Sequence, residues 1–380
     1  MAKKMYVGVS DVARKVSKMY VGVNGVARKV KKAYVGVGGV ARQFFQSVTA
    51  PSNLGVARSH LASSKIGNYA LICGGYTSNS STSSRVDAYN DTLTRSTPTS
   101  LSQARGALVG TTIGSYALFG GGASGSTKYS TVDAYNTSLT RSTPTALSVS
   151  GTTFGATTIG NYALFGGGYG SSMSSAVITY NTSLTRSTAT NLSSARTETS
   201  ATTVGNYALF GGGFDGSTYF KNVDAYNTSL TRSRPTDFTT GRSEYGATTV
   251  GNYAIFGGGY ISVSSTYALT YTNKMEGYDS SLTKVSVDTL RSARGFFRKA
   301  ATVGNYAMFC GGKWASGASK LVDAYNNSLT HTYPSDLTTD RDSATAVTIG
   351  DYMLACGGTA TNGTYLSSVE VYDKNKNKLF

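Results

Sequence analysis

Carboxylates that recur at a fixed position are the first residues in this sequence to consider for chemistry. Two carboxyl groups that flank a substrate can serve as general acid and base. Here each aspartate follows a valine in the segment VDAYN, so all of them occupy equivalent positions in separate repeats. This pattern predicts a structural hydrogen bond that each repeat makes, rather than a catalytic pair. These aspartates are Asp87, Asp133, Asp224 and Asp323.

The other residue types that carry catalysis are scarce. The chain has two histidines, His60 and His331, and neither has metal-ligand spacing or a place in a Ser/His/Asp or Cys/His arrangement. The three cysteines take a repeat position that glycine fills elsewhere, which indicates small buried residues rather than a disulfide or metal site. The repeated GGG is followed by no helix and is no phosphate loop. We therefore expect no enzyme activity, catalytic residue, cofactor or metal.

Arginines also recur, at the end of an L-x-x-x-R segment that opens each repeat. Their regular spacing predicts links between neighbouring repeats, and a ring of positive charge that faces an acidic ligand is the alternative. Glycine stands at this position once, as Gly151. The arginines are Arg58, Arg105, Arg196, Arg242, Arg294 and Arg341.

A repeated segment, GNYALFGGG in its commonest form, organises residues 54 to 380. Seven copies occur, and their first glycines are 47, 46, 45, 46, 53 and 46 residues apart. Each unit contains four short strand patterns: a run of small residues, YALFGGG, VDAYN and TSLTRST. Only 14% of the residues are charged, and the chain has 45 glycines and 27 tyrosines. Seven such units predict an all-β, seven-bladed β-propeller.

The segments between the second and third strands vary in length and sequence, whereas the tight turns hardly vary. Variable loops on a rigid ring are where binding residues usually lie. These loops mix aromatic with small polar residues, which suits a sugar or protein ligand; packing of loop on loop is the alternative. The candidate ligand-binding residues are Tyr76, Lys128, Tyr129, Tyr169, Phe214, Asp215, Tyr219, Tyr260, Tyr267 and Trp314.

Residues 1–46 contain a shorter repeat of 14 residues, clearest in YVGVNGVARKVKK, and carry a net charge of +9 out of +16. A turn signal such as Asn24-Gly25 between valine-containing runs predicts a β-hairpin in each unit. Lone hairpins are marginal in water, so we expect them to pack on one another, on sister chains or on another protein. The candidate anchor residues are Tyr6, Val7, Val9, Tyr20, Val21, Val23, Arg28, Lys29, Tyr34, Val35, Val37 and Arg42.

The domain prediction follows from the two repeats: residues 1–46 form an anchor segment and residues 47–380 form the propeller. The last unit leaves little room for a fourth strand. Residues 44–49 align with the fourth strands of other units, so we expect them to close the last blade and remove an open edge.

The long units resemble kelch repeats over residues 54 to 373. The resemblance depends on the glycine doublet (Gly121-Gly122), the later tyrosine (Tyr135) and the opening arginine (Arg105). It implies a propeller that binds ligands through its loops. The sequence departs from that family in the fourth strand, where Leu, Thr and Arg replace the expected tryptophan.

The short units resemble basic repeats at the start of structural proteins of bacteriophages and prophages of Gram-positive bacteria. This resemblance implies a virion protein, a fibre or decoration on capsid or tail, whose hairpins attach to other virion proteins and whose propeller contacts a host glycan or protein. We expect a homo-oligomer made in the host cytoplasm without a signal peptide, with neither membrane insertion nor nucleic-acid binding. The alternatives are a cellular kelch-type interaction scaffold and a glycan-binding or glycan-active protein.

Overall fold

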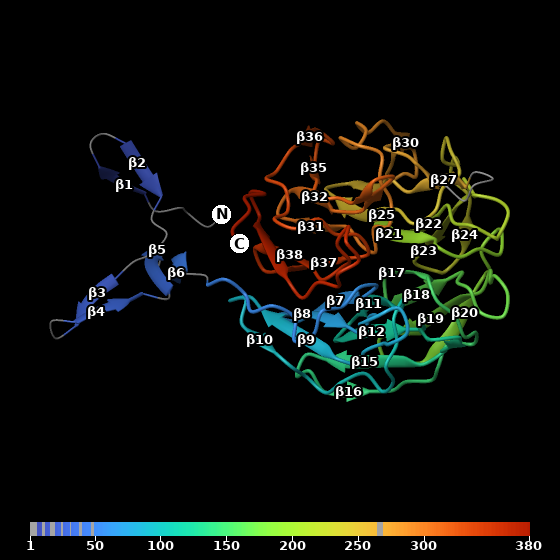
Figure 1. The fold of residues 1–380 in the computed structure, drawn as a ribbon, viewed down its shortest axis with the longest axis horizontal. Coiled ribbons are helices and arrows are strands. Elements are labelled where there is room, and N and C mark those ends of the chain that lie inside the picture. Colours follow the sequence, from blue (N-terminus) through green and yellow to red (C-terminus); the bar gives the residue numbers. More distant parts are fainter. Residues whose placement is uncertain are drawn as a thin grey trace. The chain divides into compact units, whose positions relative to one another are not determined.

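The computed structural model describes residues 6–9, 12–15, 20–23, 26–30, 32–37, 40–46, 49–263 and 269–380. Contacts divide the chain into two units, residues 1–51 and residues 52–380 (Figure 1).

The first unit contains three β-hairpins, each a separate two-stranded antiparallel sheet. In the middle hairpin Val23 pairs with Val26 and Val21 with Arg28, which is the register expected from the valine pattern and a two-residue turn. The other two hairpins have the equivalent pairs, Val9 with Val12 and Val37 with Val40. The strands are β1 (Tyr6–Val9), β2 (Val12–Lys15), β3 (Tyr20–Val23), β4 (Val26–Lys29), β5 (Lys32–Val37) and β6 (Val40–Gln46).

The second unit is an all-β, seven-bladed propeller, as the seven repeats predict (Figure 1). Each blade is an antiparallel sheet whose first strand lines the central channel. In chain order, the blades contain these strands: blade one, β7 (Ala62–Ile66), β8 (Tyr69–Cys73), β9 (Val86–Asn90) and β10 (Arg95–Ser96); blade two, β11 (Val109–Ile113), β12 (Tyr116–Gly120), β15 (Val132–Asn136) and β16 (Arg141–Ser142); blade three, β17 (Gly155–Ile159), β18 (Tyr162–Gly166), β19 (Val177–Asn181) and β20 (Arg186–Ala189); blade four, β21 (Ser200–Val204), β22 (Tyr207–Gly211), β23 (Val223–Asn227) and β24 (Arg232–Ser233); blade five, β25 (Gly246–Val250), β26 (Tyr253–Gly257), β29 (Met275–Asp279) and β30 (Lys284–Val285); blade six, β31 (Ala301–Val303), β32 (Tyr306–Cys310), β35 (Val322–Asn326) and β36 (His331–Thr332); and blade seven, β37 (Thr345–Ile349), β38 (Tyr352–Cys356) and β39 (Val369–Asp373).

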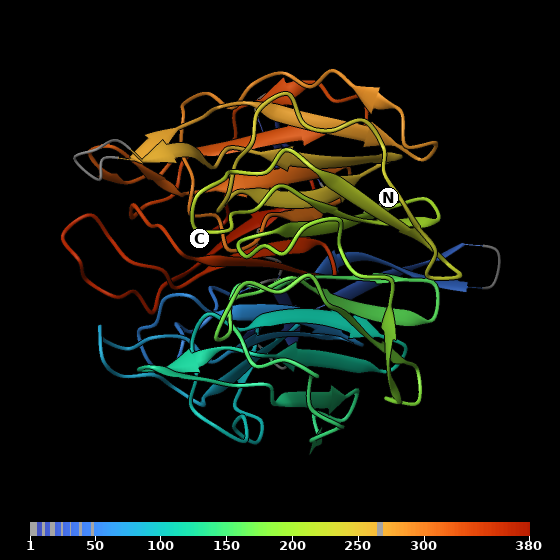
Figure 2. The ribbon, with the colours of Figure 1, turned by 90° about the vertical axis from the view of Figure 1, so that its right-hand side faces the viewer.

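Three blades carry an extra two-stranded ribbon in the loop after their second strand. In Figure 2 the strands of the ring lie between two faces made of loops and turns. We call the face with the ribbons the loop face and the opposite one, with the tight turns after the first strands, the turn face. The ribbons are β13 (Ala123–Ser124) with β14 (Thr127–Lys128), β27 (Tyr260–Val263) with β28 (Leu269–Tyr271), and β33 (Lys313–Trp314) with β34 (Gly317–Ala318).

The last blade is completed by the C-terminal residues, and this corrects one prediction. Leu379 N donates to Val371 O (2.8 Å) and Val371 N donates to Phe380 O (3.2 Å), so residues 378–380 take the outer position beside β39. Residues 40–46 instead form β6, which pairs with β5. The expectation that residues 44–49 fill this position is therefore wrong, because a hairpin partner nearby in sequence satisfies their backbone groups.

The opening residues link neighbouring blades through their backbone. In every blade the second glycine of the GG doublet donates its N–H to the carbonyl of the next opening residue, at 2.8–2.9 Å. These glycines have φ between 95° and 111°, a conformation that favours glycine. Gly151 makes the same bond as the six arginines, because the link needs no side chain.

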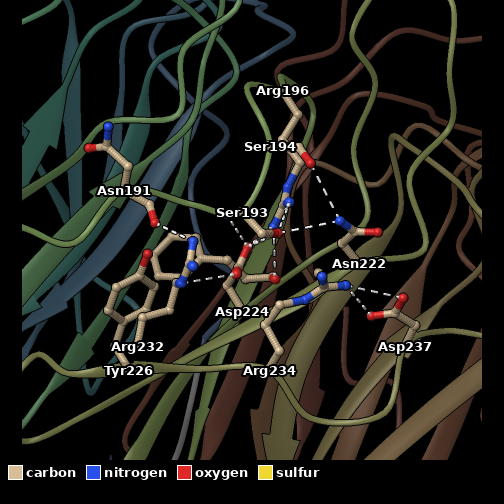
Figure 3. A network of polar contacts seen from close by, with 12 residues as sticks. Asn191, Ser193, Ser194, Arg196, Asn222, Asp224, Tyr226, Arg232, Arg234 and Asp237 are labelled. Atoms are coloured by element: carbon tan, nitrogen blue, oxygen red, sulfur yellow. Dashed lines mark hydrogen bonds and ion pairs between the residues drawn. The ribbon is translucent and has the colours of Figure 1, made fainter.

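The arginine side chains serve a different purpose. All six are 0% exposed, and each binds the aspartate or glutamate of its own third strand. Figure 3 shows the network of blade four, where Arg196 Nη2 lies 2.7 Å from Asp224 Oδ2, which also accepts from Ser193 N and Oγ. The alternative of a positive ring that faces a ligand is wrong, because these charges are buried and paired.

Blade three lacks both members of this pair. Gly151 replaces the arginine, and Ile178, fully buried, replaces the acid. In the other six blades a basic side chain of the outer strand also approaches the acid, for example Arg95 Nη1 at 2.7 Å from Asp87 Oδ1. These basic side chains lie on the strand where a kelch repeat would have tryptophan.

Burial also explains the cysteines. Cys73, Cys310 and Cys356 are free, and burial raises the pKa of the Cys310 and Cys356 thiols to about 12. They fill the glycine-equivalent position at the end of the second strand, where Cys73 and Cys356 are buried as predicted and Cys310 is partly buried. Among the described residues no helix is long and apolar enough to cross a membrane.

Candidate functional site

The loop-face end of the central channel is surrounded by seven residues in the left-handed region. One lies two residues after each opening position, with φ between 50° and 58°. For a side-chain-bearing residue this conformation costs about 1–2 kcal/mol, and such residues concentrate at functional sites. Backbone bonds of 2.7–3.2 Å run from blade to blade among them. The seven are His60, Ala107, Thr153, Glu198, Glu244, Phe296 and Ser343.

Two of these residues place carboxylates at the channel mouth. A cavity of about 40 Å³ is lined by Glu198, Glu244 and Arg298 together with residues of blades three to six. Glu244 Oε1 lies 3.4 Å from Arg298 Nη1, and both side chains are about nine-tenths buried. Glu198 Oε2 accepts a hydrogen bond of 2.7 Å from Tyr260 Oη. The mouth therefore holds two oriented acids and one guanidinium.

Burial shifts the protonation of this cluster. It raises the pKa of Glu244 to about 7, against the attraction of Arg298, and the negative charge of Glu198 adds to the rise. Burial likewise raises the pKa of Asp342 and, together with repulsion by Arg298, lowers the pKa of His60 to about 3. Glu244 therefore gains or loses its proton near neutral pH, whereas His60 stays neutral.

Arg298 and the next residue, Lys299, owe their position to an insertion. In six units the turn glycine follows the opening residue by nine positions, but Gly304 follows Arg294 by ten. The extra residue shortens the first strand of blade six to Ala301–Val303. Lys299 Nζ reaches past blade seven and donates to Ser63 O of blade one, at 2.9 Å. This one-residue difference was the available sequence signal, and sequence reasoning missed it along with both glutamates.

Aromatic residues from three blades form a continuous row beside the carboxylates. Phe214 stacks on Tyr219 (centroids 4.6 Å apart), and Tyr219 meets the edge of Tyr260 at 5.5 Å. Tyr260 in turn stacks on Phe296 at 5.5 Å. Three members of this row were predicted from the loops, and Phe296 was not.

The other predicted loop residues lie apart from this row. Tyr76 packs on His60, with centroids 5.5 Å apart, at the blade-one side of the channel. Lys128 Nζ lies 3.4 Å from the ring centroid of Tyr169 and donates to Gly170 O at 2.6 Å, which joins blades two and three. These contacts are the loop-to-loop packing that was the alternative for individual residues.

Three further predictions have less to do with the channel. Asp215 caps its own loop by accepting from Ser217 N and Thr218 N, at 2.9 and 2.7 Å. Tyr129 bonds through its backbone to Gly122, and Trp314 lies in β33. Tyr267 lies outside the described residues. The predicted anchor residues lie on strands β1 and β3 to β6, where only the backbone is described.

This arrangement suits recognition of a polar ring-shaped ligand. Aromatic faces offer stacking area, and the carboxylates accept hydrogen bonds from hydroxyl groups. Within the described part of the chain, no group of three His, Cys, Asp or Glu residues is placed to hold a metal ion.

Comparison with known proteins agrees with this fold. A family model described as "Kelch motif" matches residues 340–378, the last unit of the ring, and does not extend to residues 1–46. A solved structure titled "Structure of YjhT" has a TM-score of 0.58 at 10% identity, and the match covers 87% of this chain and 99% of that one. At this identity the likeness concerns the fold alone. No curated protein matches the sequence. The chain is thus a seven-bladed propeller that contains a kelch motif.

Proposed function

We propose that this protein is a non-enzymatic binding head on an attachment segment, and specifically a structural protein of a bacteriophage particle that contacts the host surface. The observation that carries the binding role is the aromatic row beside Glu198 and Glu244. These side chains lie on a closed ring whose six buried blade arginines are paired with acids of the scaffold. The proposed ligand is a host-surface glycan, because stacking faces beside hydrogen-bond acceptors suit sugar rings.

The attachment role is supported by the first unit. Three separate hairpins with valines in equivalent positions cannot each bury an apolar face alone. A neighbouring virion protein or a sister chain would cover them, and their resemblance to phage repeats favours the virion. A cellular interaction scaffold is the alternative, and it would use the same loop face on a protein.

Binding of the full chain to polysaccharides from Gram-positive cell walls tests the head. We expect Tyr219→Ala to weaken binding about tenfold, because one stacking face is lost. Tyr333→Ala is the matched control, since Tyr333 is 62% exposed and lies outside the row. Equal affinity of the two variants, or no binding by the unmodified chain, would refute the glycan role.

Sedimentation of the full chain tests the attachment segment. We expect a chain with aspartate in place of Val7, Val21 and Val35 to lose self-association or incorporation into particles, because charge is placed on the shared apolar face. A control replaces Lys15 and Lys32, which are not among the candidate anchor residues, by glutamine. If the triple variant assembles like the unmodified chain, the segment is no anchor.

Glu244 favours a second candidate, a glycan-active site. A carboxyl group with a pKa of about 7 suits proton transfer at neutral pH. Chromatography of soluble cell-wall fragments after incubation with the protein tests this role. A product that forms with the unmodified chain and not with Glu244→Gln would replace the non-enzymatic proposal.

A further inference from the structure

The turn-face end of the channel contains a second cavity, at the opposite end from the carboxylates. Its volume is about 410 Å³, and it is lined by two successive first-strand residues of blades one to five, by three successive residues in each of blades six and seven, and by Lys299. We call this cavity the hydroxyl well. Most of its lining side chains are threonines, and none is an acid.

Six threonine hydroxyls of the well already donate their protons to hydrogen bonds within the protein. In six blades the last first-strand residue that lines the well is a threonine that donates to the backbone carbonyl of its equivalent in the preceding blade. Five of these also contact a hydroxyl of the preceding blade at 2.7–3.0 Å. A hydroxyl has one proton, so each of these five oxygens must accept there. The wall therefore offers lone pairs to a ligand. The six are Thr112, Thr158, Thr203, Thr249, Thr302 and Thr348.

Among the described residues that line the well, the charged ones are two lysines. Lys65 takes the place of the seventh threonine and is exposed. Lys299 is the residue beside the blade-six insertion and also lines the deeper cavity of about 90 Å³. Among the described residues, neither ammonium forms a salt bridge with a carboxylate. The one bond of Lys299 goes to the Ser63 carbonyl and leaves two of its N–H groups to a ligand.

Lys299 is only partly exposed, and an unpaired cation withdrawn from water is costly unless an anion accompanies it. Burial lowers the pKa of Lys299 to about 8. The other charged residues that line the same two cavities, Arg298 and Lys65, are also cations. The well thus combines uncompensated positive charge with a wall of hydrogen-bond acceptors.

We propose that the hydroxyl well binds a hydroxylated anion, a polyol or sugar that carries one acidic group. Lys65 and Lys299 hold the acidic group, and the ligand's hydroxyls donate to the threonine oxygens. A volume of about 410 Å³ accommodates a ligand of roughly monosaccharide size, since a water molecule occupies about 30 Å³. This site is separate from the loop face, so it stands or falls independently of the proposed function.

Calorimetry of the full chain with glycerol 1-phosphate, glucuronate and glycerol tests the proposal. We expect the two anions to bind and uncharged glycerol not to bind. The stronger anion identifies whether phosphate or carboxylate is the natural acidic group. Absence of binding by both anions, or equal binding of glycerol, would overturn the proposal.

Two lysine variants localise the site. We expect Lys65→Met and Lys299→Met each to weaken anion binding about tenfold or more, because a charge-assisted hydrogen bond is lost. Lys320→Met, an exposed lysine away from the well, should bind as the unmodified chain does. Affinity should fall between pH 8 and 10 as Lys299 loses its proton, and Lys299→Met should lack that step. Since Lys65 is exposed, Lys65→Met should keep the fold, and unchanged affinity in that variant would refute the assignment.

Discussion

Charges buried in the blades and charges in the channel follow different rules. In the blades, each buried arginine is paired with an aspartate or glutamate of the same blade. A basic side chain of the outer strand also approaches each of these acids, as Arg95 approaches Asp87 beside Arg58. In the channel, Arg298 meets Glu244 only at 3.4 Å, and Lys299 has no acid at all among the described residues. The blade charges recur in six units, whereas Glu244, Arg298 and Lys299 are not repeated, so the channel charges are not part of the repeated scaffold.

The difference lies in pairing. A buried charge that has an opposite charge of the protein beside it, which we call saturated, stabilises one arrangement, whereas an unsaturated charge, which has none, can bind an ionic ligand. Blade three supports this division, because it has neither arginine nor acid and keeps the same four strands. The following experiments test the contrast.

The largest effect should come from breaking one saturated pair. Arg196→Met leaves Asp224 buried without its main partner, and we expect a loss of about 3–5 kcal/mol in the free energy of unfolding. Urea titration followed by circular dichroism measures it. Arg234→Met, which removes an exposed pair with Asp237 in the same view (Figure 3), should cost at most about 1 kcal/mol. Similar losses in both variants would remove the contrast.

Replacing Lys299, beside which the described residues place no opposite charge, should raise the free energy of unfolding rather than lower it. In the unfolded chain lysine titrates near pH 10.4, and in the folded chain Lys299 titrates near 8. Between pH 8 and pH 10.4 the unfolded state holds the extra proton, so the free energy of unfolding rises with pH. Below pH 8 the charge of Lys299 lowers the free energy of unfolding by its full amount. Lys299→Met should therefore stabilise the protein at pH 7 by on the order of 1–3 kcal/mol and lose this rise. A destabilised variant with an unchanged pH profile would contradict the prediction.

Glu244 should give a smaller change in another pH window. Its pKa rises from 4.5 in the unfolded chain to about 7 in the folded one, so the folded state holds the extra proton between these values. Stability then falls as pH rises from 4.5 to 7. Glu244→Gln should remove this slope, an effect on the order of 2 kcal/mol. The pKa of about 7 already includes the attraction of Arg298. Thermal unfolding at pH 5 and pH 8 measures the difference, and an identical slope in both proteins would show that Glu244 is not the group.

The smallest change should come from removing both members of a saturated pair. Arg196→Met combined with Asp224→Ile resembles the apolar solution of blade three, and replacing a buried ion pair by apolar residues is often nearly neutral. We expect a loss of about 1 kcal/mol or less, well below that of Arg196→Met alone. If the double variant is as unstable as Arg196→Met alone, the loss in the single variant does not come from the unpaired charge of Asp224.

The sequence predicts the ring because local signals recur in phase. Seven YALF strands, glycine doublets that need positive φ and a two-residue turn in each hairpin determine strand number and register without long-range information. The buried role of the cysteines follows in the same way. The closure of the last blade was not predictable from alignment, because the choice between residues 44–49 and residues 378–380 depends on which segment is already paired.

The candidate site was only partly predictable for a related reason. Tyr219 and Tyr260 could be found because aromatic residues in variable loops attract attention, but their stacking against Phe296 depends on how three blades meet. Glu198 and Glu244 stand where the other units have histidine, alanine, threonine, phenylalanine or serine, so no recurring motif identifies them. Lys299 was signalled only by the spacing of ten residues before Gly304.

That insertion gives the ring an orientation. A sevenfold repeat offers a ligand on the axis seven nearly equivalent poses, which would blur any preference for one of them. The extra residue in blade six places Arg298 and Lys299 on one side of the channel. Lys65 in blade one stands at the one position of the well where the other six blades have threonine. The two ends of the channel therefore each have charged side chains on one side only. A propeller of seven similar blades can in this way hold an asymmetric ligand in a single pose.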